Sequence, residues 1–208
     1  FYPVLGEDQE LSYLKNGRYA SNNYLKVDYY KGRFAAGMQA EGYFPSTIGY
    51  PIAQNSLSVS NLYLNWTDDS YSVTVGTFYD QLGSGLLFRS WEDRTLGLNN
   101  AILGAKATWS FKDMLSVKVF GGIPRLGKIS PVAYNTGSLQ TEFFGLGLSE
   151  TSIATADLSV SISDILKWDT MILSLEGSVL YKNEILPEKY LKRGCPEKSV
   201  GWSGRLNL

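Results

Sequence analysis

Apolar and polar residues alternate along most of this chain with a period of two. In the segment 33–44 the apolar positions are Phe34, Ala36, Met38 and Ala40, with polar or small residues between them. Neighbouring side chains of a β-strand point to opposite faces, whereas a helical face repeats about every 3.6 residues. The pattern therefore predicts a strand with one apolar face and one polar face.

The same alternation occurs in nine segments, and no segment has the period of an amphipathic helix. All seven prolines lie outside these segments, as expected for a residue that cannot donate a hydrogen bond within a sheet. Residues 1–21 form an N-terminal segment before the first of them. We predict strands at 24–30, 33–44, 61–66, 72–77, 103–110, 115–119, 154–162, 173–179 and 200–208.

The connections between these strands alternate between short and long. The short turns lie at 31–32, 68–70 and 112–113, with a slightly longer one at 163–169. The long connections lie at 45–60, 80–100, 123–151 and 183–198. Transmembrane barrels have short turns at one end and long loops at the other, joined by strands of about 9–11 residues. The sequence thus predicts an all-β fold, an antiparallel up-and-down transmembrane β-barrel.

The positions of charged and aromatic residues agree with this prediction. Aromatic residues lie beside the short turns, at Phe34, Trp66, Tyr71, Trp109 and Phe111, and Phe44 and Tyr79 lie at the opposite strand ends. Two aromatic belts that bound an apolar band are typical of a membrane wall. The alternative is a soluble β-sandwich whose aromatic residues fill a dry core. The charges of the polar faces, expected to face the barrel lumen, are Lys26, Asp28, Arg33, Glu41, Lys106, Lys118, Asp157, Glu176 and Arg205.

Nine strands are an odd number, whereas bacterial barrels of this kind have an even number. Either a tenth strand lies within 11–20, or residues 1–208 are the N-terminal portion of a larger barrel domain. We favour the second, because an open sheet in lipid would leave the backbone amides of its edges without partners.

Composition excludes several functions. The formal net charge is −1, which argues against a nucleic-acid partner. The chain has no histidine and a single cysteine, Cys195, so histidine-dependent triads and zinc sites of the Cys/His type are excluded. We predict no cofactor and no metal site.

The segment 78–101, FYDQLGSGLLFRSWEDRTLGLNNA, carries the densest cluster of candidate chemistry. It contains neither G-x-S-x-G nor the phosphate-binding pattern G-x-x-x-x-G-K-[ST]. Glu92 and Asp93 are adjacent, so they point to opposite sides of an extended chain, unlike the paired carboxylates of a glycosidase. We therefore predict no catalytic residue in this segment.

The mixed charges of the same segment indicate a loop that folds inward and is braced against the barrel mouth. Its charges could pair with one another or with polar-face groups such as Lys106 and Glu41. Leu86, Leu87, Phe88 and Trp91 would give the loop a small apolar core. The residues expected to brace the mouth are Asp80, Gln81, Arg89, Glu92, Asp93 and Arg94.

This run resembles a family of Bacteroidota outer-membrane β-barrel proteins of unknown function. The similar positions are Phe78, Tyr79, Asp80, Gln81, Gly83, Ser84, Gly85, Arg89, Glu92, Arg94, Leu96, Gly97 and Asn100, and the segment NNYLKVDYYKGRFAAGMQAEGYFP at 22–45 is also similar. Members of that family look about twice as long as this chain. The resemblance implies a bacterial outer-membrane location, but it supplies no activity, ligand or catalytic residue.

Three functions fit these observations. The first is a structural or accessory component of an outer-membrane assembly for secretion, insertion or uptake, with lipid and other proteins as partners. The second is a passive diffusion pore whose lumen charges line a wet channel. The third is an outer-membrane hydrolase, which would need a nucleophile such as Ser84 to act without histidine. We expect the first of these functions, and we expect no enzymatic activity.

Overall fold

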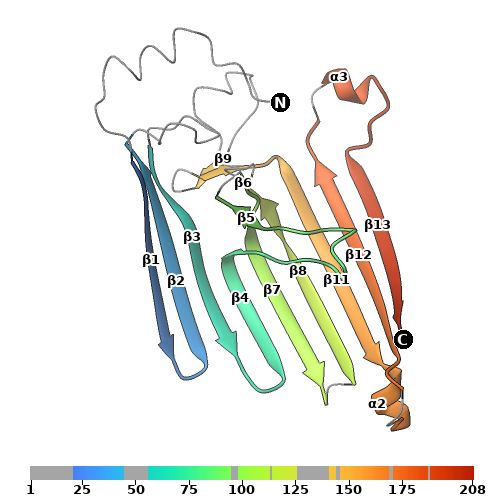
Figure 1. Ribbon diagram of the computed structural model, residues 1–208. Coiled ribbons are helices and arrows are strands. Elements are labelled where there is room, and N and C mark those ends of the chain that lie inside the picture. The colour runs from blue at the N-terminus through green and yellow to red at the C-terminus, as the bar shows by residue number, and fades with distance from the viewer. Residues whose placement is uncertain are drawn as a thin grey trace.

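A computed structural model describes residues 21–44, 56–94, 98–112, 114–125, 141–143, 146–168, 171–186 and 188–208. Nine strands form its main sheet: β1 (Asn22–Lys31), β2 (Phe34–Tyr43), β3 (Ser56–Thr67), β4 (Tyr71–Phe78), β7 (Ile102–Phe111), β8 (Leu115–Pro124), β11 (Thr151–Ser161), β12 (Ser174–Glu184) and β13 (Lys198–Asn207). These strands pair antiparallel in the order in which they follow along the chain (Figure 1). All nine predicted strands are therefore confirmed.

The sheet is open. Among the described residues, β1 and β13 form its two edges and do not pair with each other (Figure 1). The predicted all-β, antiparallel, up-and-down architecture is confirmed, whereas the described sheet is not closed into a barrel. The tenth strand considered for 11–20 lies outside the described residues, as does all but the last residue of the predicted N-terminal segment.

Several short elements in the connections were not predicted. They are β5 (Glu92–Asp93) paired with β6 (Leu98–Asn99), β9 (Thr141–Phe143) paired with β10 (Leu146–Leu148), and the helices α2 (Ile162–Leu166) and α3 (Glu188–Leu191). Elements of two to five residues are too short to show a period in the sequence. No helix among the described residues is long and apolar enough to cross a membrane.

One prediction about proline is wrong. Strand β8 extends five residues beyond its predicted end, so Pro124 is its last residue and lies opposite Ile102. A strand end tolerates proline because few ladder hydrogen bonds follow it. The other described proline, Pro196, lies outside the strands as predicted.

Glycine permits close contact between two strands near the loop end. Gly76 of β4 has a φ of +113°, and a Cβ atom there would lie 2.1 Å from the backbone oxygen of Leu62. Both the positive φ and the close approach require a residue without a side chain. The hydroxyl of the next residue, Thr77, donates a hydrogen bond of 3.0 Å to the same Leu62 oxygen, so side-chain bonding supplements the ladder at this irregular position.

The strand register keeps apolar residues opposite one another across the whole sheet. Ala107 of β7 lies opposite Val73 of β4 and Val119 of β8, and Val119 lies opposite Ala156 of β11. This apolar face is not a buried core, because Trp202 is 81% exposed and the following face residues are also exposed: Leu25, Val27, Leu64, Val75, Val119, Leu158, Leu175 and Leu206. Within the described part of the chain, this exposure argues against the dry core of a β-sandwich.

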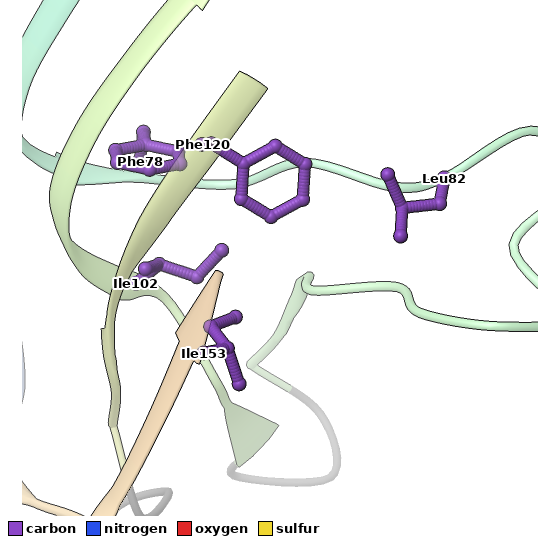
Figure 2. Close-up of a cluster of buried hydrophobic side chains, with 5 residues drawn as sticks. All are labelled: Phe78, Leu82, Ile102, Phe120 and Ile153. Atoms are coloured by element: carbon purple, nitrogen blue, oxygen red, sulfur yellow. The ribbon is translucent and has the colours of Figure 1, made fainter. Parts of the chain in front are cut away.

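The buried core lies on the opposite, polar face, near the end of the sheet that carries the long connections. Its members are Phe78, Leu82, Ile102, Phe120 and Ile153 (Figure 2). The rings of Phe78 and Phe120 pack edge to face with centroids 6.0 Å apart. Because Leu82 belongs to the connection between β4 and β7, this core joins that connection to the sheet.

Candidate functional site

A strap, defined as residues 79–94 and 98–101, crosses the polar face of the sheet. It leaves β4, extends over the neighbouring strands and returns to β7 (Figure 1). A Cβ atom added to Gly83 would lie 3.7 Å from Ser178 Oγ in β12, and one added to Gly201 in β13 would lie 2.6 Å from Leu87 Cδ1. The strap therefore extends from β4 as far as the last strand of the sheet.

Backbone and side-chain hydrogen bonds hold the strap in a hairpin. The Ser90 amide donates to the Asp80 carbonyl at 2.8 Å, and the Leu82 amide donates to the Phe88 carbonyl at 3.0 Å. The Asp80 amide donates to Ser90 Oγ at 2.8 Å. The tip turns at Gly83 and Gly85, whose φ angles of 50° and 86° favour glycine.

Asp80 anchors the strap to the polar face. Its carboxylate accepts hydrogen bonds from Lys118 at 2.8 Å and forms an ion pair with Lys106 at 3.0 Å. Lys118 also donates to the Gln81 carbonyl at 2.7 Å. Burial alone would raise the pKa of Asp80, but Lys118 and Lys106 outweigh it and hold the pKa below its ordinary value. Asp80 is therefore a carboxylate that joins the strap to β7 and β8.

Arg94 places the other end of the strap against β1 and β2. Its guanidinium carbon lies 4.3 Å from the centre of the Tyr24 ring, and Nη2 donates to Gln39 Oε1 at 3.4 Å. Its Nε lies 3.4 Å from Glu92 within the strap. Together with Leu87 near β13, Arg94 gives the strap contacts with both halves of the sheet.

The remaining residues predicted to brace the mouth have local contacts. Gln81 and Arg89 form an isolated β-bridge across the hairpin, and the guanidinium of Arg89 lies 5.5 Å from the centre of the Trp91 ring. Asp93 pairs with Leu98 in the small β5–β6 sheet. The structure thus brings Asp80 and Arg94 to the main sheet, whereas Arg89 contacts the strap itself. The bracing of a barrel mouth by these residues stays a prediction.

The apolar contribution of the strap differs from the prediction. Leu87 and Phe88 pack against the core, but Leu86 is 92% exposed and Trp91 is also exposed, so the prediction was wrong for these two residues. The main apolar contact is Leu82, which is 1% exposed. It was missed because its neighbours are polar or small, so no apolar run marks the position.

The nine charges predicted to face a lumen are distributed between the polar face and the turns. Lys26 pairs with Asp28 at 3.2 Å, and Glu176 with Arg205 across β12 and β13. Glu41 is buried and accepts hydrogen bonds from Gln39 and Tyr43. Lys118 lies 3.8 Å from Asp157, and Lys106 contacts Asp80.

Arg33 differs, because it pairs at 2.8 Å with Asp68 of the neighbouring short turn. Whether a lumen exists stays a prediction.

A hollow of about 370 Å³ opens on the polar face over β1 to β4. Tyr79 was predicted to belong to an outer aromatic belt. It lines this hollow beside Phe78 instead, so the prediction was wrong for this residue. The other lining residues are Tyr30, Ala35, Asn61, Tyr63, Asn65, Thr74 and Thr77. In the part of the chain that the structure describes, no three potential metal ligands gather, and Ser84 is exposed in the strap tip.

The fold and the strap define the chain as an antiparallel all-β protein with an exposed apolar face and a partly covered polar face. Residues 3–208 match the model of a family described as "Family of unknown function (DUF6029)", and the chain belongs to that family. The predicted membership of a family of unknown function is confirmed at this level. Searches of curated proteins and of solved structures found no significant match.

Proposed function

We propose that this chain forms part of the wall of an outer-membrane β-barrel in a Bacteroidota bacterium. It acts there as a structural or accessory component of an assembly for secretion, insertion or uptake. The observation that carries the proposal is the continuous apolar face, which crosses all nine strands and is exposed. Transfer of a large apolar side chain from water into an apolar environment gains about 1.5–3 kcal/mol, so lipid would stabilise this face strongly.

The aromatic residues near the short turns support a membrane boundary at that level. Phe34 lies opposite Trp66, and Tyr71 lies opposite Trp109, whose ring stacks on Phe111. Helix α2 lies at the same end of the sheet (Figure 1). The helix and the residues that follow it carry exposed apolar side chains: Ile165, Leu166, Trp168, Met171 and Ile172. Aromatic and apolar residues at one common level are typical of a bilayer interface.

The open edges support closure by further strands. In lipid, each backbone group without a hydrogen-bond partner costs several kcal/mol, so a sheet with free edges at β1 and β13 is unstable there. Additional strands that pair with these edges would close a larger barrel, of which the described sheet is one portion.

The strap favours an accessory role over a passive pore. It covers the inner face of such a barrel, with Leu87 near β13 and Arg94 near β1 and β2. A connection that spans the interior in this way obstructs a channel. The hydrolase alternative gains no support from the strap tip, where Ser84 is exposed between Gly83 and Gly85.

The membrane location is tested with variants that keep a single tryptophan, reconstituted in vesicles that contain brominated lipid. Trp109 lies on the apolar face, whereas Trp91 lies in the strap. We expect bromine to quench Trp109 strongly and Trp91 weakly. Equal quenching of both residues, or quenching of neither, would contradict a lipid-facing wall.

The accessory role needs a separate test, because a pore also has a lipid-facing wall. The tagged protein is extracted from its native membrane in mild detergent and its molecular mass is measured. Recovery with specific outer-membrane proteins is expected, and these should withstand a wash in moderate salt. An isolated monomer that conducts ions in planar bilayers would favour the pore instead.

A further inference from the structure

Two buried side chains at the loop end of the sheet carry hydrogen-bond donors without partners. Arg125 is 7% exposed, and its Nε and Nη1 atoms have no hydrogen-bond partner within the described ranges. Asn99, at 1% exposure, has an unpartnered Nδ2 atom among the same residues. Buried donors without a hydrogen-bond partner are costly, above all on a charged group, so this arrangement requires an explanation.

One buried residue, Ala101, links the backbone of Arg125 to the side chain of Asn99. The Arg125 amide donates to the Ala101 carbonyl at 2.7 Å, and the Ala101 amide donates to Asn99 Oδ1 at 3.1 Å. The Asn99 oxygen is thus engaged with backbone, and its amino group, which faces the hydroxyl of Tyr79, is the only donor of this side chain. Asn99 comes from β6 of the strap and Arg125 follows β8, so the pair lies where the strap meets the sheet.

Tyr79 lies next to the same two residues. Burial and the charge of Glu92 raise the pKa of Tyr79 to about 12, against the opposing effects of Asn99 and Arg125. Its hydroxyl is therefore neutral at ordinary pH and does not compensate the charge of Arg125. The phenol can still donate one hydrogen bond to an acceptor held by its neighbours.

Nearby carboxylates already have other partners. Glu92 pairs with Arg94 at 3.4 Å, and Glu41 accepts hydrogen bonds from Gln39 at 3.1 Å and Tyr43 at 2.9 Å. Neither bonds to Arg125 Nε or Nη1. The free groups of Arg125 and Asn99 are all donors, and a planar guanidinium favours carboxylate and phosphate oxygens.

We propose that Arg125 and Asn99 form a binding site for one oxyanion, a carboxylate or phosphate group, with Tyr79 as a neutral third donor. The occupant joins the strap to β8 and accepts hydrogen bonds from the free donors of Arg125 and Asn99. The site stands independently of the proposed membrane location, because it rests only on the contacts within the folded chain.

The test measures the thermal unfolding midpoint of the protein in a non-ionic, phosphate-free detergent. Inorganic phosphate or acetate is titrated at constant ionic strength, with chloride as the balancing ion. A ligand that binds only the folded state at 100 times its Kd raises the folding equilibrium constant about 100-fold, so the midpoint of the wild-type protein rises. We expect one of the two anions to produce this rise.

Variants assign the response to the site. Arg125→Met keeps an unbranched apolar side chain and removes the charge, so it should fold without the anion and show no midpoint rise. Asn99→Ala should weaken the response at least several-fold. Arg33→Met removes a turn arginine that already pairs with Asp68, and it should keep the full response.

A second titration separates the two sources of a phosphate group. Phosphatidic acid is added to the detergent micelles in place of the free anion. A midpoint rise with phosphatidic acid alone identifies a lipid headgroup as the occupant, and a rise with the free anion identifies a soluble one. The proposal is overturned if neither stabilises the wild-type protein, or if Arg125→Met responds as the wild-type protein does.

Discussion

At the scale of single residues, Asp80 is the main polar link between the strap and the sheet. Its carboxylate contacts two lysines, and both lysine side chains are largely buried. Hydrogen bonds to charged groups contribute about 1.5–3 kcal/mol each in favourable geometry, and partial exposure reduces this. A change at Asp80 should therefore affect stability much more than a change at an exposed carboxylate.

We predict that Asp80→Asn lowers the free energy of unfolding by about 2 kcal/mol, because it leaves Lys106 and Lys118 without their shared carboxylate. Equilibrium unfolding in urea measures the change. Asp69→Asn is the matched control, since Asp69 is exposed and comes no closer than 4.0 Å to Arg33. This substitution should change the free energy of unfolding by less than about 0.5 kcal/mol. Equal effects of the two substitutions would contradict an anchoring role for Asp80.

The pH dependence of stability should reflect the same interaction of the Asp80 carboxylate with its two lysines. The folded protein holds the pKa of Asp80 below its ordinary value of 3.8, so the unfolded chain binds the proton more tightly. The stabilisation is therefore fully present above about pH 4 and is lost as the pH falls through the lower folded value. The stability difference between the wild-type protein and Asp80→Asn should stay constant from pH 7 to pH 5 and shrink below pH 4. A difference that grows on acidification would contradict this assignment.

At the scale of elements, the strap attaches to the sheet through one apolar side chain more than through any other. Leu82 and Leu86 are chemically identical and four residues apart, yet one is buried in the core and the other is exposed. We predict that Leu82→Ala lowers the free energy of unfolding by about 2–4 kcal/mol through the lost contacts and the cavity left behind. Leu86→Ala should change it by less than about 0.5 kcal/mol. Limited proteolysis at the strap tip provides a second readout, with faster cleavage only in Leu82→Ala.

The same elements explain how much of the structure could be predicted from the sequence. The strands were predictable because a period of two persists over whole segments such as 154–162, and a one-residue shift would expose the wrong face. Most individual contacts of the strap were not, since they depend on long-range geometry, although the sequence indicated that a charge of this segment could pair with Lys106. Nothing local to Asp80 indicates that it meets Lys118, and nothing local to Arg125 indicates that its side chain is buried.

At the scale of the whole molecule, the sheet has its faces reversed relative to a soluble domain. Its apolar face is exposed, and its buried core lies on the polar side under the strap. A soluble protein would leave a very large apolar patch in water, which is rare outside interaction surfaces. If lipid covers the apolar face, an added charge should therefore destabilise the protein on that face and have little effect on the polar face.

Val119 and Ser159 provide a matched pair for this test. Val119 lies on the apolar face in the centre of the sheet, opposite Ala107 and Ala156, whereas Ser159 lies on the polar face opposite Ser116 and Glu176. In a bilayer, arginine at a lipid-facing midplane position costs about 2–4 kcal/mol, so Val119→Arg should lower the free energy of unfolding by that amount in vesicles. Ser159→Arg gains Glu176 as a neighbour and should have little effect. Because an exposed position in water tolerates such a change within about 0.5 kcal/mol, a negligible effect of Val119→Arg in vesicles would show that lipid does not cover this face.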